Sequence, residues 1–206
     1  MATVSLGRAR QRSVVADAVT TRDRIMDAVV ACIDRRGMSG FALEEVAVEA
    51  GVSRATIYRY FDGGRPQLVR ESVTREVSMF WTELAEAVRG IPDLEGRLVA
   101  GMMLAQEKLR THDLLQRLLV SEPDEFLPAL FESEPLVHLV LRDYLQELLE
   151  AEELRPGLER EEAADYLARM LLVHIGSPGR WDMTDEAQVR RLVRTQFLAG
   201  VVASGN

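Results

Sequence analysis

The sequence predicts an all-α protein, with an N-terminal three-helix domain of the helix-turn-helix type followed by a larger helical domain. Apolar residues recur at steps of three and four along the 206 residues, as amphipathic helices require. No segment shows the strict alternation of a convincing strand. Glycine and proline separate the periodic stretches, which predicts short helices joined by turns.

Composition narrows the class of protein. Apolar residues make up 47% and charged residues 28%, as in ordinary globular proteins, which excludes a disordered or collagen-like chain. The single Cys32 cannot form an internal disulfide and suits a reducing compartment. The sequence lacks a run of about 18 apolar residues, and residues 1–19 do not resemble a secretory signal. We therefore expect a cytoplasmic protein without a membrane partner.

Three short helices are expected near the N-terminus, at residues 23–36, 43–50 and 54–61. The second and third are joined by a three-residue turn that contains Gly51, which tolerates a positive φ. Ser53 takes the capping position before the third helix. Two short helices joined in this way form a helix-turn-helix.

Further helices are expected in the remainder of the chain, where turn residues mark their ends. A helix that starts near Pro66 leads directly out of the helix-turn-helix unit. The expected ranges are 66–89, 94–111, 114–120, 123–131, 135–153, 159–175 and 185–203.

Charge is distributed unevenly along the chain. Residues 1–70 carry 11 arginines and 8 acidic residues, whereas the remainder carries 14 basic and 25 acidic residues. A basic N-terminal third on an acidic body is a common layout for a nucleic-acid reader, although chance clustering would look the same.

The third short helix presents side chains suited to DNA. Ile57 is expected to point inward, which leaves Arg54, Thr56, Tyr58 and Arg59 outside. Arginine reaches phosphate or guanine, and hydroxyl groups donate to phosphate oxygens. Each residue alone fits an ordinary surface or packing role, but together in a helix-turn-helix they favour DNA contact.

Residues 25–68 resemble the DNA-binding domain of the TetR family of bacterial transcriptional regulators, most strongly in the run from Val46 to Phe61. The resemblance implies that Arg54, Thr56 and Tyr58 take positions that usually touch DNA, and that Phe61 packs the domain. The expected DNA-binding residues are Ser53, Arg54, Thr56, Tyr58, Arg59, Tyr60 and Arg65.

Two departures from the family pattern stand out. Phe41 and Ala42 occupy the place where the family usually has a capping Thr or Ser, so we expect Ser39 to cap the second helix instead. Gly63, Gly64 and Arg65 replace the usual Ser-Lys, and Arg65 is expected to contact phosphate one position later.

We divide the chain into a flexible basic arm (1–20), a helix-turn-helix DNA-binding domain (21–68) and a helical ligand-binding and dimerisation domain (69–206). The arm carries Arg8, Arg10 and Arg12. It is either a solvated tail or an extension that reaches the minor groove.

The acidic body contains methionine and aromatic residues that suit an adaptable apolar pocket, although any one of them is more often plain core. The resemblance implies a ligand cavity between helices of this domain, which we expect to bind a hydrophobic small molecule. The expected ligand-binding residues are Met102, Met103, Gln106, Phe126, Phe131, His138, Tyr144 and His174.

By resemblance, the last two helices pair with their copies in a homodimer. Two half-sites about 34–36 Å apart on DNA also call for two recognition helices. The expected interface residues are Leu167, Met170, Leu171, Leu192, Val193, Gln196 and Phe197.

These expectations describe a homodimeric repressor that a hydrophobic small molecule releases from double-stranded operator DNA. A regulator without a small-molecule ligand, or an activator, would have the same DNA-binding residues. The sequence offers no Ser-His-Asp grouping and no phosphate-binding loop, so an enzyme is not expected. His112, His138 and His174 lack metal-ligand spacing, and we expect no metal or other cofactor.

Overall fold

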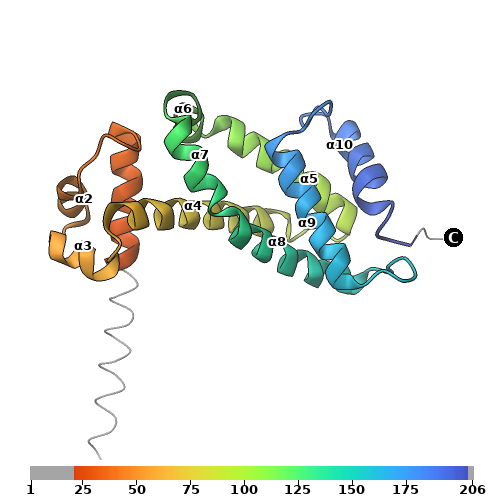
Figure 1. The fold of residues 1–206 in the computed structure, drawn as a ribbon. Helices are drawn as coiled ribbons and strands as arrows, with labels where there is room; N and C mark the ends of the chain where they lie inside the picture. Colours follow the sequence, from red (N-terminus) through yellow and green to blue (C-terminus); the bar gives the residue numbers. More distant parts are fainter. Residues whose placement is uncertain (1–20, 204–206) are drawn as a thin grey trace, which may run out of the picture. The chain divides into compact units, whose positions relative to one another are not determined.

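The computed structural model describes residues 21–203, and these residues form helices joined by turns (Figure 1). The predicted all-α fold is confirmed. Within this range, no helix is both long and apolar enough to cross a membrane. Residues 21–36 are helical, and the later elements are α2 (Leu43–Ala50), α3 (Arg54–Tyr60), α4 (Gly64–Val88), α5 (Leu94–Thr111), α6 (Asp113–Ser121), α7 (Pro123–Phe131), α8 (Glu134–Leu148), the 3-10 turn η1 (Leu149–Ala151), α9 (Arg160–Gly176), α10 (Glu186–Leu192) and the π-helical segment η2 (Val193–Leu198).

The chain forms two compact units that interleave along the sequence. Of the described residues, the first unit contains 21–75 together with Leu118–Glu132, so it includes α7. The second unit contains Glu76–Arg117 and the chain from Ser133 onward. Each unit has its own buried apolar residues and is described by itself.

The core of the first unit joins the 21–36 helix to α3 and α4. Ile25, Ile57, Phe61 and Leu68 are all fully buried. The Arg22 guanidinium covers the Phe61 ring at 4.4 Å from its centroid and donates to the Tyr60 carbonyl at 2.9 Å. This packing holds α3 against the first helix, so the opposite side of α3 faces outward.

The turn between α2 and α3 has the geometry that the sequence predicts. Gly51 ends α2 in the left-handed region at φ 64°, and the Val52 amide donates to the Ala47 carbonyl at 2.9 Å. Ser53 caps α3 by accepting a hydrogen bond from the Thr56 amide at 3.1 Å. The predicted Ser53 cap and the inward position of Ile57 are confirmed.

The loop between the first helix and α2 contacts Glu122, which is distant in the sequence. Gly37 has φ 81°, and the Glu122 carboxylate lies so close that a Cβ on Gly37 would come within 2.0 Å of Glu122 Oε1. Glu122 also accepts a hydrogen bond from the Ser39 amide at 3.1 Å. The expectation that Ser39 caps α2 is wrong, because the cap residue is Ala42 and no side chain bonds the helix start.

The second unit is built around the α8–α9 pair and α5. Buried residues of these helices and of the C-terminal segment form one core, which includes Met102, Leu145, Leu167, Leu192 and Phe197. Fully buried alanines on α9 allow its neighbours to approach closely.

The C-terminal segment differs from the single helix expected at 185–203. Asp185 caps α10 through the amides of Ala187 and Gln188, but the α-helix ends at Leu192 and continues as η2. The chain then turns and pairs with the segment after η1, through an isolated bridge between Leu154 and Val202. The apolar periodicity of residues 185–203 predicts which side chains are buried, such as Leu192 and Phe197. It does not predict the change from α- to π-helix, because a π-helical segment of six residues is too short to alter that pattern clearly.

We predict that Gly37→Ala destabilises the protein more than Gly51→Ala. Both glycines have positive φ, which costs alanine about 1–2 kcal/mol, but open space surrounds only Gly51. Alanine at position 37 must also displace Glu122 and break its hydrogen bond to Ser39, which adds about 1 kcal/mol. Urea denaturation followed by circular dichroism measures both variants.

The Glu122→Ala background supplies the control, because it should remove the additional cost of Gly37→Ala while leaving Gly51→Ala unchanged. Equal destabilisation by the two glycine substitutions in the wild-type background would show that the Glu122 contact contributes nothing.

Candidate nucleic-acid interface

The N-terminal part of α3 presents an exposed polar face. Arg54 exposes 52% of its side chain and Tyr58 is 43% exposed, whereas Ile57 between them is fully buried. The Ser53 and Thr56 hydroxyl groups lie 3.0 Å apart at the helix start. This face therefore offers a guanidinium group and several hydroxyl groups within two turns of helix, a set that suits phosphates and base edges.

Arg54 is held by neighbours on both helices of the pair. Its Nη1 donates to the Glu44 carboxylate of α2, and its guanidinium lies 5.9 Å from the Tyr58 ring centroid. The Tyr58 hydroxyl, and then the Glu44 charge, raise the pKa of Arg54. The group is charged throughout the physiological range.

Arg59 and Tyr60 complete the C-terminal end of α3. The Arg59 guanidinium lies 5.2 Å from the Tyr60 ring centroid, and Arg59 makes no ion pair with any residue in the range 21–203. Its charge is therefore available to a phosphate. Tyr60 is half-buried, and its backbone carbonyl is taken by Arg22.

Arg65 has a structural task in the loop before α2. Its Nη2 donates to the Met38 carbonyl, and its guanidinium lies 4.4 Å from the Phe41 ring centroid. The Arg65 Nε is buried without a partner among the described residues. Contact between Arg65 and a phosphate stays a prediction. It requires Nη1 or Nε, because Nη2 already donates to the Met38 carbonyl.

The glutamates of α2 neutralise much of the local positive charge, which the sequence did not reveal. Glu44, Glu45 and Glu49 each pair with an arginine of the first unit. Glu49 lies 2.7 Å from Arg35, and Glu45 lies 3.8 Å from Arg36. The sequence shows three glutamates within α2, but helical spacing does not identify partners that come from other elements.

The predicted arm at 1–20 lies outside the described residues. By sequence it holds Arg8, Arg10, Arg12 and one aspartate, so it supplies two of the three excess positive charges in residues 1–70. Contact of this arm with DNA stays a prediction.

The structure places the predicted ligand-binding residues in both units. Phe126 and Phe131 belong to the first unit and the other six to the second. Phe131 is 66% exposed to solvent, so a role in ligand binding stays a prediction. Met102 is fully buried in the second core, with Met103 packed against that core.

Three polar residues among the predicted ligand-binding residues contact groups of the second unit itself. Gln106 Nε2 donates to the Ile175 carbonyl at 2.5 Å, near the C-terminal end of α9. His138 Nε2 lies 3.3 Å from Asp165 Oδ1, and His174 Nδ1 lies 2.8 Å from the Met170 carbonyl. The Tyr144 hydroxyl and His138 Nε2 are buried and make no well-formed hydrogen bond to any described residue, although His138 Nε2 lies within ion-pair distance of Asp165.

Most of the predicted dimer-interface residues are buried inside the second unit itself. This corrects the prediction, because a side chain in the protomer's own core cannot contact a second copy. Met170 and Gln196 remain at the surface, half-buried and exposed respectively. The buried members are Leu167, Leu171, Leu192, Val193 and Phe197.

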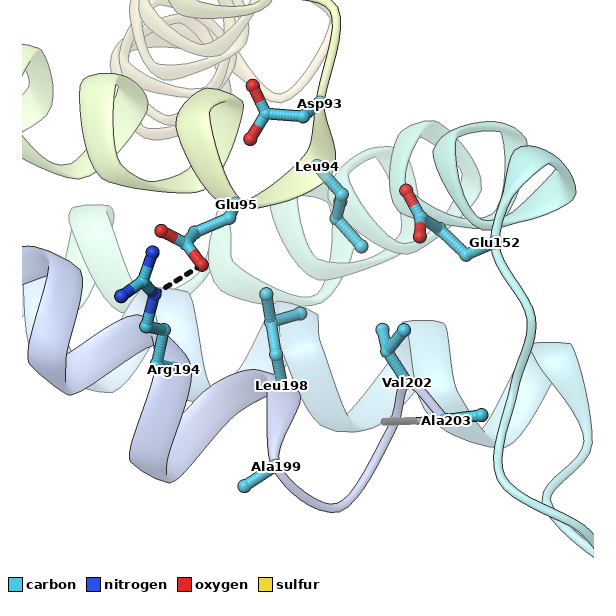
Figure 2. A pocket seen from close by; sticks show the side chains of 9 residues that line it. All are labelled: Asp93, Leu94, Glu95, Glu152, Arg194, Leu198, Ala199, Val202 and Ala203. Carbon is cyan, nitrogen blue, oxygen red and sulfur yellow. Dashed lines mark hydrogen bonds and ion pairs between the residues drawn. The ribbon is translucent and has the colours of Figure 1, made fainter. Parts of the chain in front are cut away.

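A pocket of about 330 Å³ lies in the second unit between the start of α5 and the C-terminal segment. Figure 2 shows the side chains of Leu94, Leu198 and Val202 pointing toward its interior, with Glu95 joined to Arg194 at one side. Arg194, and then Arg190, lower the pKa of Glu95. None of the predicted ligand-binding residues lines this pocket.

Comparison with known proteins identifies the first unit. Residues 25–71 match the family model of the bacterial regulatory proteins of the tetR family. The uncharacterized HTH-type transcriptional regulator Rv2250c of Mycobacterium tuberculosis is 30% identical over 109 residues. This alignment covers 52% of the chain and 53% of the relative, so the chain spans about half the length of the curated relative that it matches.

Solved structures share the fold. The transcriptional repressor QsdR of R. erythropolis, from the TetR family, has a TM-score of 0.61 at 19% identity, with 91% of this chain and 98% of that chain covered. SmeT, solved as a complex with triclosan, has a TM-score of 0.53 at 21% identity, with 90% and 93% covered. The matching family and the curated relative are described as regulatory proteins, which agrees with the expectation that the chain is not an enzyme. Residues 25–71 of the chain are therefore a helix-turn-helix domain of the kind that the bacterial regulatory proteins of the tetR family carry.

Proposed function

We propose that this regulator is a cytoplasmic homodimeric repressor that binds double-stranded operator DNA through the exposed face of α3 and is released by a hydrophobic small molecule. The single observation that carries the DNA-binding proposal is the exposed row of Arg54 and Tyr58 on a helix whose opposite face is locked by Ile57 and Phe61. A rigid helix with a free polar face has the form that enters a major groove about 12 Å wide.

We predict that Tyr58→Ala weakens operator binding at least about tenfold, because it removes a hydroxyl donor to phosphate and the ring beside Arg54. A gel shift with the DNA that flanks the gene, at two salt concentrations, measures the loss. Wild-type binding should fall as salt rises, because phosphate contacts release counterions.

Met79→Ala is the matched control, since Met79 is a large side chain of the second unit with the same exposed fraction as Tyr58. It should bind DNA as the wild type does. Undiminished binding by Tyr58→Ala, at an unchanged melting temperature, would remove α3 from the interface.

The homodimer is proposed to form through the exposed side of α9 and η2, in place of the buried residues named above. Val173 is 61% exposed and Tyr166 is 40% exposed on α9. The Tyr166 hydroxyl donates to the Gln196 carbonyl, which ties α9 to η2 and makes a continuous surface. A two-fold axis would bring each of these side chains against the same surface of the second copy.

We predict that Val173→Glu shifts the protein from dimer to monomer, with at least about a tenfold increase in the dimer dissociation constant. The cause is a carboxylate buried without a partner at the interface. Light scattering coupled to size-exclusion chromatography, over a range of concentrations, measures the change. Val120→Glu, at an exposed valine of the first unit, should leave the dimer intact; a wild-type monomer at micromolar concentration would contradict the proposal.

The effector is proposed to bind among the helices of the second unit near Met103 and Tyr144. Both side chains are partly buried against the second core, and methionine adapts to varied apolar shapes. Burial raises the pKa of Tyr144, partly offset by the charges of Arg97 and Arg89 and by the nearness of Arg97 to the hydroxyl, which makes no well-formed hydrogen bond to any described residue. The SmeT–triclosan complex, which shares the fold, supports an apolar ligand with a polar group.

We predict that triclosan, used as the probe, raises the melting temperature of the wild type and weakens its gel shift. Tyr144→Phe should bind the probe about three- to tenfold less tightly, because one neutral hydrogen bond is lost. Tyr60→Phe, in the first unit, is the control for loss of a hydroxyl group in the melting-temperature measurement alone, because Tyr60 is itself an expected DNA-binding residue. If lipophilic compounds as a class leave both the melting temperature and the DNA affinity unchanged, the protein is a regulator without such a ligand.

A further inference from the structure

The first turn of α2 places a carboxylate beside the exposed face of α3. Glu44 is 58% exposed at its side chain and accepts a hydrogen bond from Arg54 Nη1. The Arg54 guanidinium in turn lies 5.9 Å from the centroid of the Tyr58 ring. The three side chains form a continuous row across the two helices, which we call the Glu44–Arg54–Tyr58 row.

The position of Glu44 in the first turn of α2 favours a negative charge modestly, but it does not require a partner on α3. An ion pair between two half-exposed side chains contributes little to the free energy of unfolding. Close to DNA, a carboxylate repels phosphate groups, and the repulsion acts within a Debye length of about 10 Å. On a surface that meets DNA, Glu44 is therefore a cost to affinity unless it contributes to recognition.

The geometry of arginine suggests what that contribution is. A guanidinium is planar and carries five N–H donors in a fixed fork, so its orientation decides which acceptors it meets. Glu44 accepts from Nη1, and both the ring and the hydroxyl of Tyr58 lie beside the guanidinium. Nε and Nη2 form a second edge. Two neighbouring N–H groups on one edge match O6 and N7 of a single guanine.

We propose that Glu44 is a positioning residue for DNA sequence recognition: it holds the Arg54 guanidinium so that its second edge meets the O6 and N7 atoms of one guanine in the operator. The inference rests on the proposed function, in which α3 lies in the major groove. It adds a specificity-determining role for a residue of α2 that carries the same charge as the DNA.

The experiment is a selection of bound duplexes from a random-sequence library by the full chain. The wild type is compared with Glu44→Gln, Arg54→Gln and the double variant. Glu49→Gln is the matched control, because it removes the same charge from another exposed glutamate–arginine pair on α2. Affinities for the selected site, for the same site with one base pair replaced, and for unrelated DNA are then measured at one salt concentration.

We expect Glu44→Gln and Arg54→Gln to lose preference at the same guanine position, each by about tenfold. The double variant should lose no more than either single variant, since both act through one contact. Glu44→Gln should bind unrelated DNA at least as tightly as the wild type, because a negative charge is gone. Glu49→Gln should select the wild-type site, and melting temperatures should agree among all variants.

Three results would overturn the inference. If Glu44→Gln tightens binding to all DNA equally and keeps the wild-type preference, Glu44 is an ordinary surface charge. If its preference changes at a position where Arg54→Gln keeps the wild-type preference, Glu44 contacts a base directly, as a carboxylate does with cytosine N4. If the wild type selects no sequence and binds no duplex, the proposed function itself fails, and the positioning role fails with it.

Discussion

The left-handed turn at Gly51 is the constraint on which the exposed face of α3 depends. A residue with a Cβ disfavours φ 64°, and without this turn the chain would not reverse within the three residues between α2 and α3. The turn delivers Ser53 to its cap and Ile57 to the core. Once those two positions are fixed, the helical repeat alone determines that Arg54 and Tyr58 lie outside.

Much of the helix-turn-helix was predictable from sequence because its determinants are local. Gly51, Ser53 and the apolar spacing of α2 and α3 each act within a few residues, and the structure agrees with them. The α2 glutamates could not be foreseen as arginine partners, since Arg35 and Arg54 reach them from other elements. The count of residues 1–70 already includes these glutamates, and two of its three excess positive charges lie in residues 1–20, so residues 21–70 keep an excess of only one.

The second unit was less predictable for a different reason. Periodicity on α9 and α10 identified buried faces, but it does not say whether the same chain or a second copy covers them. Leu167 and Leu192 are covered by the protomer's own helices, which moves the candidate contact surface to residues such as Val173. The α-to-π transition after Leu192 is followed by the pairing of Leu154 with Val202, which joins segments distant in sequence and has no local signal.

The contact of Glu122 with the loop at Gly37 has a consequence for how the protein can be divided. Because α7 packs in the same compact unit as residues 21–75, that unit is assembled from two stretches of chain separated by more than forty residues. Arg70 of α4 and Glu132, just after α7, approach each other to 4.0 Å, which closes the same junction at a second point. A fragment that ends after α4 would lack α7 and therefore part of the first unit. To fold as in the full chain, the isolated unit needs either the intervening helices or a linker that returns α7 to the Gly37 loop.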